Sequence, residues 1–287
     1  MAVNDIAAFS VRFSTGKSSS AGANDVASAG LVGAVPFVPN CCMTQTNSPS
    51  QLAPEPFIIP ARHRGPPDSG NGGIVSGRLA GLLAPGPVEV TLRAPIPLDR
   101  AMQVDLRDGA ADLRDGATLI AEARTATLDL EVLGPVSWDV AEACSRVGGS
   151  DAQSDFNHCF ACGRGHGPKE GLRVWASAVP GRDLVAAALV ADPVHGDADG
   201  FLPAPLLWAA IDCPGAIAVG ANQERMMLTG RMVAEVTGRV RTGERAIVVG
   251  WPLGQEGRKL YSGTAIYNAA GELAARARIT WILLKQG

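Results

Sequence analysis

The feature that most constrains the fold is an order of elements that occurs twice along the chain: an apolar helix followed by several strands. In the first half, a Gly-rich helix is predicted from Ile74 to Leu83, because apolar residues at 75, 79, 82 and 83 share one face at helical spacing. The small residues of this helix would let a sheet approach it closely. Strands are predicted after the helix at 88–96, 102–106 and 117–132.

The second half repeats this plan. A helix is predicted over about 205–219, and the strands predicted around it are 158–162, 172–179, 184–190, 227–237, 245–251, 259–267 and 273–284. Each half ends with a turn that leads into a long last strand, at Asp115-Gly116 and at Ala270-Gly271. We therefore expect an α+β chain in which one helix-and-sheet unit is duplicated.

The remaining segments set the expected domain boundaries. Residues 1–54 are rich in Ala, Ser, Gly and Asn without a sustained period, which predicts a disordered extension, and Met43 is a hypothetical alternative start of translation. A short helix is predicted at 137–147 with Ser137 as its N-cap. The predicted order is an extension at 1–54, a first repeat at 55–147, a linker at 148–157 and a second repeat at 158–287.

Composition excludes several classes of protein. The 287 residues are 46% hydrophobic and carry a formal net charge of -3, so neither nucleic acid nor an anionic membrane is an expected partner. Gly and Pro interrupt every apolar run before it could span a bilayer, and the apolar stretch 26–38 lies too deep in the chain for a secretory leader. Six cysteines are too sparse for a disulfide framework, which predicts reduced thiols and a cytoplasmic location.

Three segments resemble a known superfamily. The run Cys159-Phe160-Ala161-Cys162-Gly163, followed by Gly171-Leu172, is similar to the Cys-Phe-x-Cys-Gly…Gly-Leu opening of hotdog-fold thioesterase-like proteins. Residues 207–215 resemble the central helix that usually follows it, and residues 65–73 resemble the loop-to-helix entry of a partner repeat. The resemblance covers about residues 56–284 and is closest to the tandem, double-hotdog acyl-CoA thioesterases.

This resemblance implies two antiparallel sheets, each wrapped around a central helix and joined side by side. In such folds the pantetheine of CoA or of an acyl carrier protein enters between the halves, and the thioester lies near a helix N-terminus. The implied activity is hydrolysis of an acyl thioester. CoA would then be part of the substrate, and no separate cofactor is expected. Oligomerisation stays open, because fusion supplies within one chain the pairing that single hotdogs obtain by dimerising.

Asp212 is the first candidate for a catalytic acid or base. It lies in an apolar helix between Ile211 and Cys213, where an ionised carboxylate is costly unless it is paired or used. The resemblance places the helix aspartate of the double-hotdog enzymes at this position, with Thr229 in the hydroxyl role. The glutamine that completes the set in those enzymes has no counterpart near 278–280. A structural carboxylate is the alternative for Asp212.

The start of the first helix is the second candidate. Asn71, Gly72 and Gly73 suit an oxyanion-binding helix N-terminus, because glycine lets a ligand approach the backbone closely. The alternative is a tight turn with an N-cap. Asp68 is another candidate carboxylate, although an Asp in a loop before a Gly more often forms a turn.

The pair Cys159-x-x-Cys162 invites a zinc interpretation, with His158 and His166 nearby. A structural zinc site normally takes four ligands, and no second cysteine pair follows, so no metal is predicted. A redox pair is also disfavoured, because the thioredoxin-like βαβ context is missing.

Other residues suggest binding roles or an alternative activity. Asp192-Pro193-Val194-His195 resembles part of the hotdog enoyl-CoA hydratase motif, but Val190 occupies the position of the catalytic Asp there, so His195 is retained as a substrate-binding candidate. Arg231 and Arg258, with Lys259, are candidates for binding CoA phosphates. A non-catalytic acyl-CoA or lipid-binding protein is the main alternative to a thioesterase.

Overall fold

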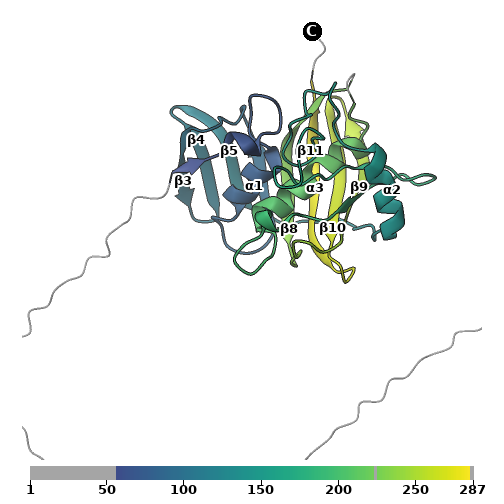
Figure 1. The fold of residues 1–287 in the computed structure, drawn as a ribbon. Helices are drawn as coiled ribbons and strands as arrows, with labels where there is room; N and C mark the ends of the chain where they lie inside the picture. The colour runs from purple at the N-terminus through teal and green to yellow at the C-terminus, as the bar shows by residue number, and fades with distance from the viewer. Residues whose placement is uncertain (1–55, 223–224, 285–287) are drawn as a thin grey trace, which may run out of the picture. The chain divides into compact units, whose positions relative to one another are not determined.

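The computed structural model describes residues 56–222 and 225–284 (Figure 1). The extension predicted over 1–54 and the alternative start at Met43 lie outside the described residues. Among the described residues, no helix combines the length and the apolar character that crossing a lipid bilayer requires.

The strands and helices follow one another in an order close to the predicted one. They are β1 Phe57–Ile58, η1 Ala61–His63, α1 Gly72–Ala80, β2 Val88–Leu92, β3 Ala101–Arg107, β4 Ala110–Asp115, β5 Thr118–Thr125, α2 Trp138–Val147, β6 Ser177–Ala178, β7 Val185–Leu189, η2 Pro193–His195, α3 Ala204–Ala218, β8 Met227–Val236, β9 Ala246–Glu256, β10 Lys259–Tyr267 and β11 Leu273–Leu283.

All strands join one antiparallel sheet in the order β1-β3-β4-β5-β2-β8-β11-β10-β9-β7-β6. In the first half α1 is followed by four strands that lie in the order β2-β5-β4-β3, and β1 pairs outside β3. In the second half α3 is followed by four strands in the order β8-β11-β10-β9, and β7 pairs outside β9. The two halves therefore have the same topology, which confirms the predicted duplication and the double-hotdog fold.

Two of the contacts between the halves join their sheets and their helices. Strands β2 and β8, the first strand after each helix, pair antiparallel from Val88↔Ala234 to Thr91↔Arg231 and make the sheet continuous. The helices α1 and α3 also pack against each other: a Cβ atom built on Gly73 would lie 2.7 Å from Ala209 Cα. Figure 1 shows both helices in front of the sheet. The small residues of α1 thus allow the backbone of α3 to approach closely, where a sheet had been predicted.

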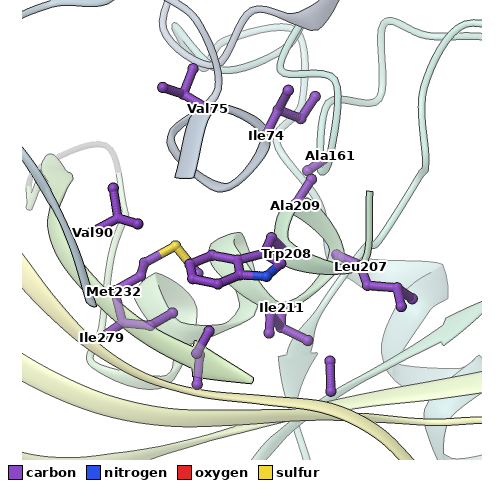
Figure 2. Close-up of a cluster of buried hydrophobic side chains, with 14 of the residues drawn as sticks. Ile74, Val75, Val90, Ala161, Leu207, Trp208, Ala209, Ile211, Met232 and Ile279 are labelled. Atoms are coloured by element: carbon purple, nitrogen blue, oxygen red, sulfur yellow. The ribbon is translucent and has the colours of Figure 1, made fainter. Parts of the chain in front are cut away.

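The main core fills the space between these helices and the sheet. Helix α3 is apolar almost all round, as expected for a helix covered on most sides, and its Trp208 and Ile211 are buried with Met232 and Ile279 of the sheet (Figure 2). A second apolar cluster occupies the opposite face of the second half's sheet, where α2 packs. The short helix at the end of the predicted first repeat therefore packs on strands of the second.

Several strand or helix predictions differ from the structure: strand β4 was not predicted, and the strand predicted at 88–96 ends at Leu92. The predicted strand 158–162 is a turn, and of the predicted strand 172–179 only the two residues of β6 pair with a neighbour. The strand predicted at 117–132 ends at Thr125, because the following apolar residues pack across the sheet face instead of joining the ladder. Helix α1 ends at Ala80, which leaves Leu82 exposed.

Candidate functional site

Asp212 lies where the two helices cross, and both of its carboxylate oxygens are hydrogen-bonded. The Gly73 N–H, in the first turn of α1, donates to Oδ2 at 3.0 Å. The Thr229 hydroxyl, on β8, donates to Oδ1 at 2.9 Å. Because Gly73 belongs to the first half and the other two residues to the second, the site exists only when the halves are joined.

The surroundings of Asp212 favour its neutral form. Only 3% of the residue is exposed, and desolvation raises the pKa of its carboxyl group from 3.8 to about 7. The Thr229 hydrogen bond and the Gly73 hydrogen bond lower the pKa, while the nearby Cys159 raises it, and these effects are smaller than that of burial. Asp212 can therefore exchange a proton near neutral pH.

The start of α1 presents a backbone N–H group beside this carboxyl. Asn71 is the N-cap, and its Oδ1 accepts from the Ile74 N–H at 3.0 Å, while its carbonyl accepts from the Val75 N–H at 3.1 Å. Gly73 N–H is bonded to Asp212, and for the buried Gly72 N–H the described residues supply no acceptor. An N–H group of this kind at a helix start is a candidate donor to a ligand oxygen.

The glycines are required here by space. A Cβ atom on Gly72 would lie 3.1 Å from both Cβ and Oγ1 of Thr229, and one on Gly73 would press on the backbone of α3. Any side chain at either position would therefore push apart the groups that hold Asp212. The predicted set of Asn71, Gly72, Gly73, Asp212 and Thr229 is brought together, while Asp68 lies exposed in the preceding turn.

The missing glutamine is not replaced from β11. Trp281 stands opposite Thr229 in the ladder, and its indole N–H donates to the Ser262 hydroxyl at 2.9 Å. The carboxamide of Asn71 is 2% exposed and directs its Nδ2 at Cys159 Sγ, 3.7 Å away.

Three cysteines adjoin the buried carboxyl. The sulfur atoms of Cys159, Cys162 and Cys213 all lie within 4.8 Å of one another. Hydrogen bonds from the Cys162 and Cys213 thiols hold the pKa of Cys159 well below its usual range, and the same contacts raise the pKa of Cys213. The spacing of the first two cysteines was visible in the sequence, but their proximity to Cys213 was not.

A pocket of about 960 Å³ lies next to this site, between α1, the start of α3 and the segment 158–170. Ile74 and Phe160 line it, and each is the sequence neighbour of a residue of the buried site, although Asp212 itself does not line the pocket. Its other polar lining residues include one acid, Glu170, and a group of basic residues: Arg62, His63, Arg78, His158, His166, Lys169 and His195.

The pocket contains all four histidines of the chain. Burial, together with the charges of Arg62, Arg78 and His195, lowers the pKa of His63 from 6.5 to about 4, so this imidazole is neutral at pH 7. The His195 ring packs edge-on against Phe160, and its buried Nε2 has no hydrogen-bond partner among the described residues.

Two of the predicted phosphate-binding residues lie elsewhere. Arg231 is bonded to the Thr91 hydroxyl at 3.0 Å and to the Glu89 carboxylate at 3.4 Å on the joined strands β2 and β8. Arg258, in the β9–β10 turn, donates to the Leu283 carbonyl at 3.3 Å. Neither arginine lines the pocket. The cations that line it, Arg62, Arg78 and Lys169, could not be selected from the sequence, because scattered Arg and Lys residues carry no spacing signal.

Comparisons with known proteins return solved structures. No family model matches the sequence, and no curated protein matches it. The tesB protein of Mycobacterium avium subspecies paratuberculosis is 13% identical, with a TM-score of 0.46 over 74% of this chain and 84% of that one. A Haemophilus influenzae thioesterase is 18% identical, with a TM-score of 0.36 over 40% and 80% of the two chains. A hypothetical thioesterase of Streptococcus pneumoniae, solved with coenzyme A, is 15% identical, with a TM-score of 0.34 over 37% and 82%.

Proposed function

We propose that this protein hydrolyses an acyl-CoA or acyl-carrier thioester, with Asp212 as the general base. The observation that carries the proposal is the buried carboxyl of Asp212, held between the Gly73 N–H and the Thr229 hydroxyl. A carboxyl group that is buried, oriented by two donors and placed at a helix N-terminus has the features of an acid–base catalyst.

The reaction follows from these groups. Asp212 removes a proton from a water molecule, whose oxygen attacks the thioester carbonyl carbon. The charge that develops on the carbonyl oxygen is stabilised by the N–H groups at the start of α1, with the free Gly72 N–H as the main donor. The C–S bond then breaks, the thiolate leaves with the proton held by Asp212, and the acid is released.

Two further residues act by positioning. The Thr229 hydroxyl fixes the plane of the Asp212 carboxyl, and Asn71 fixes the first turn of α1 by capping the Ile74 N–H. Neither needs to touch the reacting carbon for its loss to reduce the rate, because both hold the general base and the oxyanion donors in register.

The adjacent pocket suits the phosphate-bearing end of such a substrate. Arg62 and Lys169 are exposed at its rim, and Arg78 is half-buried in its wall. Cations of this kind bind phosphate oxygens through charge-assisted hydrogen bonds. We therefore assign phosphate binding to these residues in place of Arg231 and Arg258, and we retain His195 as a lining residue.

The test is release of free thiol from acyl-CoA substrates of several chain lengths, followed with a thiol reagent. The Asp212→Asn variant keeps the shape of the side chain and removes the base, so kcat is expected to fall by about 100-fold or more. Asp139→Asn, on the exposed face of α2, is the matched control and should retain full activity. Equal activity of wild type and the Asp212 variant would refute the mechanism.

A second candidate function is binding of an acyl-CoA without turnover. It is favoured by one observation: Asp212 is buried and does not line the pocket that would hold the ligand. The thiol-release assay combined with equilibrium dialysis separates the two, because a binding protein takes up acyl-CoA in dialysis and releases no thiol at any chain length.

A further inference from the structure

The cysteine trio is formed by two separate parts of the chain. Cys159 and Cys162 lie in one turn, and Cys213 comes from the middle of α3. The distance between Cys159 Sγ and Cys213 Sγ is 3.8 Å. A disulfide would require about 2.05 Å between sulfurs. Tetrahedral coordination with Zn–S bonds of about 2.3 Å places ligand sulfurs about 3.8 Å apart, so the observed spacing fits shared metal coordination.

The turn that carries the first two cysteines has a fixed shape. The Gly163 N–H donates to the Cys159 carbonyl at 2.8 Å, and a Cβ atom on Gly163 would lie 2.2 Å from the Asn157 carbonyl oxygen. The backbone from which Cys159 and Cys162 project is therefore fixed, which lowers the entropy lost when their sulfurs bind a common ion.

Polar groups around the trio favour negatively charged sulfur. Asn71 Nδ2 lies 3.7 Å from Cys159 Sγ, and the Ser150 hydroxyl lies 3.7 Å from Cys162 Sγ. Donors of this kind surround metal-bound thiolates and orient them. Cys162 and Cys213 are half-buried, and Cys159 is buried.

We propose that Cys159, Cys162 and Cys213 bind one zinc ion and so fix the turn at 159–163 to helix α3. Three thiolates leave a fourth coordination position for a water molecule or another ligand. Binding releases to solvent the protons that the thiols still carry. Thiolate sulfur selects zinc over magnesium and calcium, which prefer oxygen ligands.

The consequence for the rest of the molecule is order in the pocket wall. Residues 157–171 contain no helix or strand, yet they supply His158, Phe160, Gly165, His166, Lys169 and Glu170 to the pocket. Zinc would hold this irregular segment in place, as structural zinc ions do in other folds with few local hydrogen-bonded elements. This inference does not depend on the proposed hydrolysis.

The experiment measures zinc in the full-length chain, purified with a non-thiol reductant, by elemental mass spectrometry. Wild type is expected to hold one zinc ion per chain. The Cys213→Ser variant should bind zinc more than about 100-fold more weakly in competition with a chelator. Cys144→Ser, which removes a buried cysteine of α2, and the double variant Cys41→Ser/Cys42→Ser should both bind as wild type does.

A second measurement covers the case in which Cys213→Ser fails to fold. Wild-type protein loaded with Co²⁺ in place of zinc should show the intense sulfur-to-cobalt charge-transfer absorption that cysteine thiolate ligation gives. Absence of this absorption, zinc content well below one per chain after loading, or a disulfide within the trio in protein that takes up no zinc would each overturn the proposal.

Discussion

The crossing of the two helices predicts that a methyl group at position 77 is destabilising. Gly77 faces the start of α3, and a Cβ atom there would lie 2.7 Å from Pro205 Cα and 2.9 Å from Trp208 Cβ. Carbon atoms normally pack at about 3.5–4.0 Å, so Gly77→Ala forces the helices apart by about 1 Å. Overpacking of this kind costs about 1–3 kcal/mol, against about 1 kcal/mol that alanine gains over glycine in a helix.

The matched control is Gly81→Ala at the end of the same helix. The φ of Gly81 is -64°, and the nearest atom to an added Cβ is 3.4 Å away. This substitution should raise the free energy of unfolding by up to about 1 kcal/mol, because only the helix preference changes. Urea titration followed by circular dichroism measures both variants. The reasoning is refuted if Gly77→Ala is as stable as Gly81→Ala.

Three other predictions each concern one residue. Lys169→Met should raise the KM for acyl-CoA about fivefold, from ~1 kcal/mol of lost phosphate binding, and leave the KM for the matching acyl-pantetheine unchanged. Lys259, which the sequence also suggested for phosphate binding, is exposed at the start of β10 and does not line the pocket, so Lys259→Met is the control and should change neither KM. Tyr267→Phe removes the 2.6 Å hydrogen bond to the Leu133 carbonyl and should lower the free energy of unfolding by about 1 kcal/mol in urea titration. The pKa of His63 is about 4 in the folded chain and 6.5 in the unfolded chain, so between these values only the unfolded chain binds the proton. The free energy of unfolding should therefore decrease as the pH is lowered from 6.5 to 4, and it should decrease less in His63→Gln, as measured by urea titration at several pH values.

The fold could be predicted because its signals are local and repeated. Each of the helices α1 and α3 is followed by strands, as the sequence predicts. The sequence Leu-Arg-Asp-Gly-Ala occurs at 106–110 and again at 113–117, and each copy ends a strand in a hairpin turn, with Gly109 and Gly116 at positive φ. The strand prediction was wrong where alternating apolar residues pack on the face of a sheet and do not pair with a neighbouring strand. The residues after Thr125 alternate because they pack across a sheet face, and their sequence does not distinguish this from ladder pairing.

The candidate site was predicted only in part. Asp212 was conspicuous as an acid in an apolar helix, and the resemblance supplied Thr229. The Gly73 contact to Asp212 joins residues 139 positions apart, and Cys213 meets Cys159 across 54 positions. Contacts over such separations depend on how the halves dock, which no local period encodes.

The most direct test of the proposed site is a crystal structure of Asp212→Asn with an acyl-CoA bound. The acyl thioester is expected at the crossing of α1 and α3, with its carbonyl oxygen about 3 Å from the Gly72 N–H and its carbonyl carbon within reach of a water held by residue 212. A thioester confined to the outer pocket, with Gly72 and residue 212 untouched, would contradict it.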